Sequence, residues 1–188
     1  MADAVLLLAG GAAARLPGKL ERMVNGKPLM LHVFENLRKG GWPMYVGAAK
    51  PLPVTIASAL AATPIYDAQP LRGPLWALLD ASWQIDAERI FAIAADQPHL
   101  QAEALQHLAA AWQPGDEAVV PQHPSGIEPL AALYARDALR RAATAISPER
   151  RAMRDLLTLL RVRYETMDPR FFTNVNTPDD LQRASAIA

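Results

Sequence analysis

Short apolar runs alternate along this chain with longer stretches in which apolar residues recur every three or four positions. The runs predict buried strands, and the longer spacing predicts amphipathic helices. Strands are expected at residues 4–9, 44–48, 64–66, 89–94, 117–120, 130–133 and 162–165. Helices are expected at residues 28–38, 54–60, 75–83, 102–112, 137–143, 149–160 and 178–186.

This alternation predicts the fold class. Strands that alternate with helices pair in parallel through right-handed crossovers, which places helices on both faces of one sheet. We therefore expect a single Rossmann-like α/β domain over residues 1–188, with three α/β/α layers and a mostly parallel sheet. In such sheets, ligands bind beyond the carboxyl ends of the strands.

Composition narrows the class of protein. Of 188 residues, 51% are hydrophobic and 20% are charged, as in a globular protein, and the net charge is zero. The absence of cysteine excludes disulfides and thiolate metal sites, and the four histidines lack zinc-site spacing. No apolar stretch approaches the roughly 20 residues of a membrane span. Because the first strand begins a few residues after Met1, no signal peptide is expected. We expect a cytoplasmic protein that binds neither nucleic acid nor membrane.

The first strand runs into a glycine loop. Leu8-Ala9-Gly10-Gly11 is followed by Arg15 and then Lys19. Glycines allow backbone amides to approach a ligand closely, and two cations can then neutralise it. The P-loop pattern fails because Leu20 follows Lys19, and the three spaced glycines of a dinucleotide site are missing. The segment favours a loop that binds a polyphosphate, with an ordinary strand–turn–helix as the alternative.

A carboxylate ends the strand expected at residues 89–94. Asp96 and then Pro98 follow this strand, so the Asp96 side chain should lie at the edge of the sheet where the glycine loop begins. Mg²⁺ is commonly held by one or two carboxylates together with phosphate oxygens. Asp96 is therefore a candidate magnesium ligand. The alternative is an aspartate that only begins a turn.

Two further segments carry polar groups at strand or helix ends. Asp67 follows a strand, and Gly73 precedes a helix that begins with Pro74. Asn174 and Asn176 alternate in an extended segment before a helix start at Thr177, so both amides can face one polar heterocycle. The alternative is that the asparagines only brace this turn.

These motifs, taken together, resemble the nucleotidyltransferases of the molybdenum cofactor guanylyltransferase type. The similarity runs in order from residue 4 to about residue 183 and includes Ile127-Glu128-Pro129-Leu130 and Met153-Arg154-Asp155-Leu156-Leu157. It implies a magnesium-dependent enzyme with this fold that transfers GMP from GTP to molybdopterin and releases pyrophosphate. It implies catalytic roles for Arg15, Lys19 and Asp96, with Asp96 as metal ligand, and acceptor-binding roles for Asn174 and Asn176. The implied nucleotide-binding residues are Leu8, Ala9, Gly10, Gly11, Lys19, Asp67, Gly73 and Asp96.

The sequence departs from the family pattern at two places. Leu16-Pro17-Gly18 separates Arg15 from Lys19 in a shorter loop than usual, and residues 46–50 lack the asparagine that often contacts the nucleotide. Two alternatives therefore stay open. One is cytidylyl or other nucleotidyl transfer to a different small phosphorylated acceptor, and the other is a nucleotide-binding module without catalysis. A nicotinamide-dependent oxidoreductase is disfavoured because its glycine fingerprint is missing.

Overall fold

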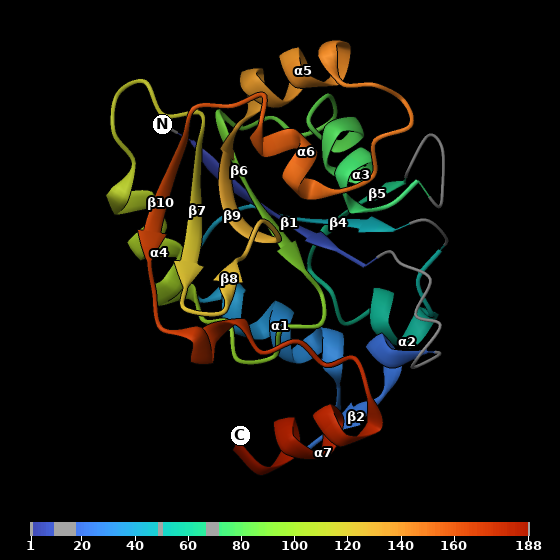
Figure 1. Ribbon diagram of the computed structural model, residues 1–188. Helices are drawn as coiled ribbons and strands as arrows, with labels where there is room; N and C mark the ends of the chain where they lie inside the picture. The colour runs from blue at the N-terminus through green and yellow to red at the C-terminus, as the bar shows by residue number, and fades with distance from the viewer. Residues whose placement is uncertain (1, 10–17, 49–50, 67–71, 188) are drawn as a thin grey trace.

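A central β-sheet with helices on both faces forms the body of the protein (Figure 1). The computed structural model describes residues 2–9, 18–48, 51–66 and 72–187. The strands of the sheet are β1 (Asp3–Leu8), β4 (Met44–Ala48), β5 (Thr63–Tyr66), β6 (Arg89–Ala94), β7 (Ala118–His123), β8 (Gly126–Ile127), β9 (Ala131–Ala135) and β10 (Val162–Thr166).

Each region in which the sequence predicts a helix contains one. The helices are α1 (Leu29–Arg38), α2 (Val54–Ala57), α3 (Pro74–Ala81), α4 (Ala102–Ala111), α5 (Arg136–Ala145), α6 (Met153–Leu157) and α7 (Pro178–Ile187), with 3₁₀ turns η1 (Lys19–Glu21) and η2 (Pro169–Phe172). Of these helices, α2 and α6 are much shorter than predicted. A short ribbon of β2 (Met23–Val24) and β3 (Lys27–Pro28) stands apart from the sheet. No helix in these ranges is long and apolar enough to cross a membrane.

Strand order confirms the predicted fold class. The order is β10-β7-β9-β6-β1-β4-β5, and β8 pairs with β7. β1 pairs in parallel with both β4 and β6, whereas β9 runs antiparallel to β6 and β7. The sheet is mostly parallel, as predicted, and β9 is an antiparallel strand because the connection from β7 to β9 is too short for a parallel crossover.

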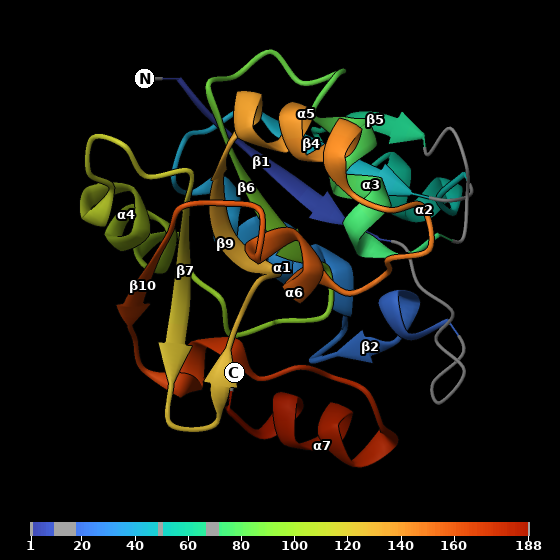
Figure 2. The same cartoon turned by 45° about the horizontal axis from the view of Figure 1, so that its top comes forward.

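Alternate residues of β1 enter two separate cores, which explains its continuous apolar sequence. Leu6 and Leu8 pack with α3, α5 and α6 on one face. Val5 and Leu7 pack with α1, α2 and α4 on the other. Figures 1 and 2 show these two helical layers on opposite sides of the sheet.

A small third core forms beyond one end of the sheet. Val24, Leu29 and Val175 are buried there, with Leu181 of α7 packed against them. The ribbon that supplies Val24 turns at Asn25-Gly26, where φ is 47° and 77°, as a tight hairpin turn requires. This core holds the C-terminal helix against the body of the protein.

Candidate active site at the carboxyl ends of the strands

The carboxyl ends of β1, β4 and β6 lie side by side. Leu8 is in register with Gly47 of β4 and with Ala94 of β6. The Ala9 N–H donates to the Gly47 carbonyl at 2.8 Å, and the Ala95 N–H donates to the Leu8 carbonyl at 3.2 Å. Leu8 and Ala9 therefore lead the chain out of the sheet directly beside the segment that carries Asp96.

The glycine loop follows from this point. Gly10, Gly11 and Arg15 lie outside the described residues. The chain is described again from Gly18, and Lys19 opens η1. The predicted roles of these four residues therefore remain predictions.

The Asp96 turn is held by neighbouring backbone and by α1. Asp96 is half-buried, and its Oδ1 atom is shielded from solvent. The Asn36 amide of α1 donates to the Pro98 carbonyl at 2.9 Å, and the Leu100 N–H donates to the Gln97 carbonyl at 3.1 Å. These bonds fix the turn, so the Asp96 carboxyl group is held at the edge of the sheet.

The asparagine segment meets this turn. The Val175 N–H donates to the Asp96 carbonyl at 2.9 Å, although 78 other residues separate the two along the chain. Asn174 is half-buried and Asn176 is exposed. The fold thus brings Asp96 together with the segment on which the sequence predicts acceptor binding.

The predicted helix start at Thr177 is present. The Thr177 hydroxyl accepts from the Asp180 N–H at 3.1 Å, and the Asp180 carboxylate accepts from the N–H groups of Asn176 and Thr177. Pro178 is the first residue of the helix. The backbone N–H of Asn176 and the side chains of Arg183 and Thr177 lower the pKa of Asp180 to about 2. The backbone of Asn176 thus takes part in the cap.

Gly73 occupies a conformation that suits only glycine. Its φ of 93° and ψ of 173° place it directly before α3, with Pro74 as the first helical residue. The preceding Asp67 lies outside the described residues. Beside this turn, the Arg72 guanidinium lies 3.5 Å from the Trp76 ring centroid, and Trp76 Nε1 donates to the Arg150 carbonyl at 2.8 Å.

A divalent cation fits Asp96 if substrate phosphates supply its other ligands. The described ranges contain no cluster of three or more histidine, aspartate or glutamate side chains that could hold a metal alone. Mg²⁺ does not need such a cluster when substrate phosphates supply its other ligands. A single partly buried carboxylate at the strand end fits that mode of binding.

Two features near this edge escape the sequence analysis. Among the residues that the structure describes, Gln97 Oε1 and His99 Nε2 are buried without a hydrogen-bond partner, and burial lowers the pKa of His99. His123 Nε2 lies 3.0 Å from Glu128 Oε1, and the His123 ring stacks on Phe172. The sequence motif contains Glu128, but no spacing signal pairs it with His123 or brings Phe172 to them.

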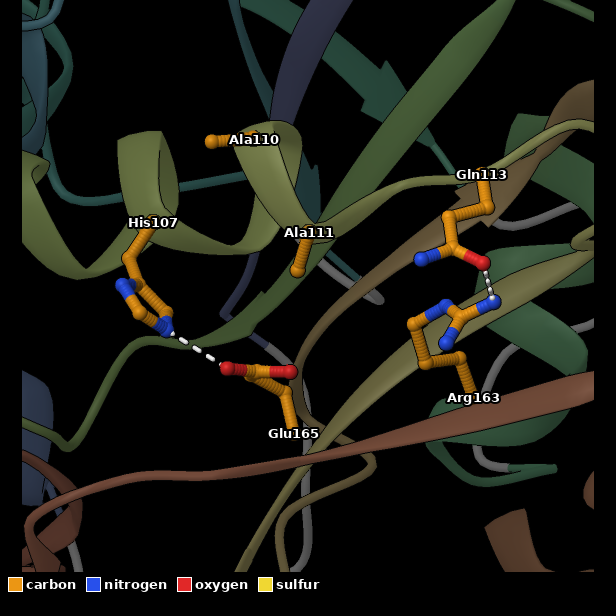
Figure 3. Close-up of a pocket in the computed structure, with 6 residues that line it drawn as sticks. All are labelled: His107, Ala110, Ala111, Gln113, Arg163 and Glu165. Carbon is orange, nitrogen blue, oxygen red and sulfur yellow. Dashed lines mark hydrogen bonds and ion pairs between the residues drawn. The ribbon is translucent and has the colours of Figure 1, made fainter.

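A shallow hollow beside β10, the outermost strand on one side of the sheet, is separate from these groups. It lies between α4 and β10, and Figure 3 shows its polar side chains pairing with one another. His107 Nε2 lies 2.8 Å from Glu165 Oε1, and Arg163 donates to Gln113 at 2.6 Å. Since β7 and β9 separate β10 from β6, this hollow is not part of the site at Asp96.

Comparisons with known proteins agree with this arrangement. Residues 5–166 match the family described as "MobA-like NTP transferase domain". The molybdenum cofactor guanylyltransferase of Desulfosudis oleivorans is 29% identical over 196 aligned positions, covering 98% of this chain and 96% of that protein. The molybdenum cofactor guanylyltransferase of Bradyrhizobium sp. (strain ORS 278) is 30% identical, covering 97% and 92%.

A solved structure extends the similarity to the fold. The crystal structure of molybdopterin-guanine dinucleotide biosynthesis protein A from Archaeoglobus fulgidus superposes with a TM-score of 0.77. It is 29% identical to this chain, and the match covers 97% of each chain.

Proposed function

This chain belongs to the MobA-like NTP transferase family, and from that premise we propose that it transfers GMP from GTP to molybdopterin and releases pyrophosphate. One observation supports this best. The Val175–Asp96 hydrogen bond joins the strand end beside the glycine loop to the segment that carries Asn174 and Asn176. A nucleotide and an acceptor bound at these two segments would be neighbours.

The reaction needs no side-chain base. A phosphate oxygen of the acceptor is already anionic at neutral pH, and it attacks the α-phosphorus of GTP. As this bond forms, the bond from the α-phosphorus to the bridging oxygen breaks, and its electron pair leaves with pyrophosphate. Catalysis then depends on positioning the two phosphates and on stabilising the developing charge.

The residues take the following proposed roles. Backbone at Leu8, Ala9, Gly10 and Gly11 holds the triphosphate, and Arg15 and Lys19 stabilise charge on the leaving pyrophosphate. Asp67 and Gly73 contact the nucleoside, and Asn174 and Asn176 bind the acceptor. Asp96 would hold Mg²⁺, which supplies positive charge shared between phosphate oxygens when it is bound.

The test is pyrophosphate release with molybdopterin and magnesium across GTP, CTP, ATP and UTP. We expect GTP to support turnover best, whereas a preference for CTP would replace guanylyl with cytidylyl transfer. No release with any nucleotide would contradict the proposal.

The same assay tests the role of Asp96. Asp96→Asn should lower turnover by far more than tenfold, a difference above about 1.4 kcal/mol in activation free energy. Asp86→Asn is the matched control, because Asp86 precedes the amino end of β6, far from Asp96, and is fully exposed. Turnover of Asp96→Asn within tenfold of the parent protein would exclude the metal role.

A further inference from the structure

A histidine–glutamate pair lies beside the acceptor segment. His123 ends β7, β8 follows after a tight turn, and Glu128 comes directly after β8. The His123 side chain is 8% exposed and that of Glu128 is 20% exposed. Both groups are therefore largely withdrawn from water.

Hydrogen bonds define which nitrogen of His123 carries the proton. The Ser125 N–H donates to His123 Nδ1 at 3.2 Å, so Nδ1 acts as the acceptor in this bond. Nε2 then carries the hydrogen and donates to Glu128 Oε1 at 3.0 Å. In the described part of the chain, the second carboxylate oxygen, Oε2, has no hydrogen-bond partner, and it is not sealed from solvent.

The pair is linked by contacts to both segments of the proposed site. The His123 ring stacks on Phe172, with centroids 5.8 Å apart and planes at 12°. Phe172 is 5% exposed and precedes Asn174 by two residues. On the other side, the Leu130 carbonyl accepts from the Ala94 N–H at 2.9 Å, just before the Asp96 turn. Figures 1 and 2 both show β8 beside the segment between η2 and α7.

We propose that Glu128 binds the heterocycle of the acceptor through Oε2 and that His123 is its positioning residue. The inference rests on the proposed function. A carboxylate is acceptor-only, so it selects a ring edge that presents N–H donors. The aminopyrimidinone edge of a pterin carries an amino group next to a ring N–H. Nearby Asn174 offers both a donor and an acceptor, which suits the mixed edge of such a ring.

His123 fixes the orientation of the carboxylate. Its Nε2–H occupies Oε1, and its ring is held between the Ser125 N–H and the Phe172 face. Glu128 therefore does not need to lose side-chain freedom when the acceptor binds. Such preorganisation increases affinity mainly by lowering the entropic cost of binding.

The experiment compares Glu128→Gln with the parent protein. Three quantities are measured: the KM for molybdopterin at saturating GTP, the Kd of GTP by calorimetry, and the thermal midpoint. We expect the KM for molybdopterin to rise at least tenfold, with GTP affinity and the midpoint unchanged. Glu165→Gln is the matched control, since Glu165 also pairs with a histidine but lies at the edge of the sheet on β10. It should change none of the three.

Two variants of His123 separate positioning from packing. His123→Phe keeps a ring against Phe172 but removes the donor to Glu128, so the KM for molybdopterin should rise. His123→Gln restores an N–H donor and should return the KM toward that of the parent protein. A KM that follows the presence of the donor, at constant thermal midpoint, supports the positioning role.

Each contrary result has a distinct meaning. Turnover by the parent protein with an unchanged KM for molybdopterin in Glu128→Gln would overturn this inference and leave the proposed function intact. A fall in thermal midpoint with parallel loss of GTP and molybdopterin affinity would overturn it in favour of a bracing role. No turnover by the parent protein with any nucleotide would overturn the proposed function and this inference together.

Discussion

The ion pair between Asp3 and Arg89 should be costly to break, because both of its charges are buried. These residues begin β1 and β6 and are partners in register. Arg89 donates through Nε and Nη2 to the two carboxylate oxygens at 2.6 and 2.8 Å. Both side chains are 9% exposed, and the guanidinium lies 5.1 Å from the centroid of the Trp112 ring. β1 and β6 lead into the glycine loop and the Asp96 turn, so this pair joins the two strands that carry the site.

Arg89→Met should therefore be costly. It keeps most of the apolar stem but leaves a buried carboxylate without its partner, which typically costs about 3–5 kcal/mol. For a chain of this length, each kcal/mol shifts the thermal midpoint by about 2–4 °C. The expected fall is about 6–20 °C, with a matching loss in the free energy of unfolding in urea.

Two further variants make the prediction sharp. Arg170→Met removes a surface partner of Asp168, where the arginine side chain is 89% exposed, and should leave the thermal midpoint nearly unchanged. The double variant Asp3→Leu/Arg89→Met removes both buried charges and should recover much of the lost stability. A loss below about 1 kcal/mol for Arg89→Met alone would refute the reasoning.

Three other predictions concern the site and its supports. Gly73→Ala and Gly115→Ala both place a side chain at φ of 93°, so each should lower the free energy of unfolding by about 1–3 kcal/mol. Calorimetry should find weaker GTP binding only for Gly73→Ala. Asp180 should titrate near pH 2 by NMR; since its folded pKa lies below its usual 3.8, its cap is complete above about pH 4 and is lost as pH falls toward about 2. A midpoint near 4 would contradict this. Asn174→Ala combined with Asn176→Ala should raise the KM for molybdopterin at unchanged GTP affinity. Each lost hydrogen bond should weaken the binding free energy of molybdopterin by on the order of 1 kcal/mol. A joint loss of thermal stability and both affinities would instead indicate bracing.

The sequence predicts the central strands well because their signal is local. β4 and β6 have the predicted bounds, since each is an uninterrupted apolar run with clear ends. β7 extends past its predicted end and includes Pro121. The proline is tolerated because pairing with β9 ends at Val119 and pairing with β8 begins at Gln122, so no ladder bond on that side needs its missing N–H.

Helix bounds fail where distant groups bind the backbone. A helix is expected over residues 149–160, but α6 spans only Met153–Leu157. Arg72 Nη2 donates to the Pro148 carbonyl at 3.2 Å, and Trp76 Nε1 donates to the Arg150 carbonyl at 2.8 Å. The donors to these carbonyls are side chains of α3 and of the residue two positions before it, and not N–H groups of the same helix. Local periodicity contains no information about such partners.

The same limit applies to the candidate site, whose separate motifs are visible in sequence but whose assembly is not. Val175 is fully buried against Val24 and Leu29, while its N–H donates to the Asp96 carbonyl. The third core therefore fixes the position of the asparagine segment relative to the end of β6. A reaction that relies on positioning two phosphates requires the distance between the asparagine segment and the end of β6 to be constant. It follows that α7 and the β2–β3 ribbon, although outside the main sheet, contribute to the geometry on which the proposed transfer depends.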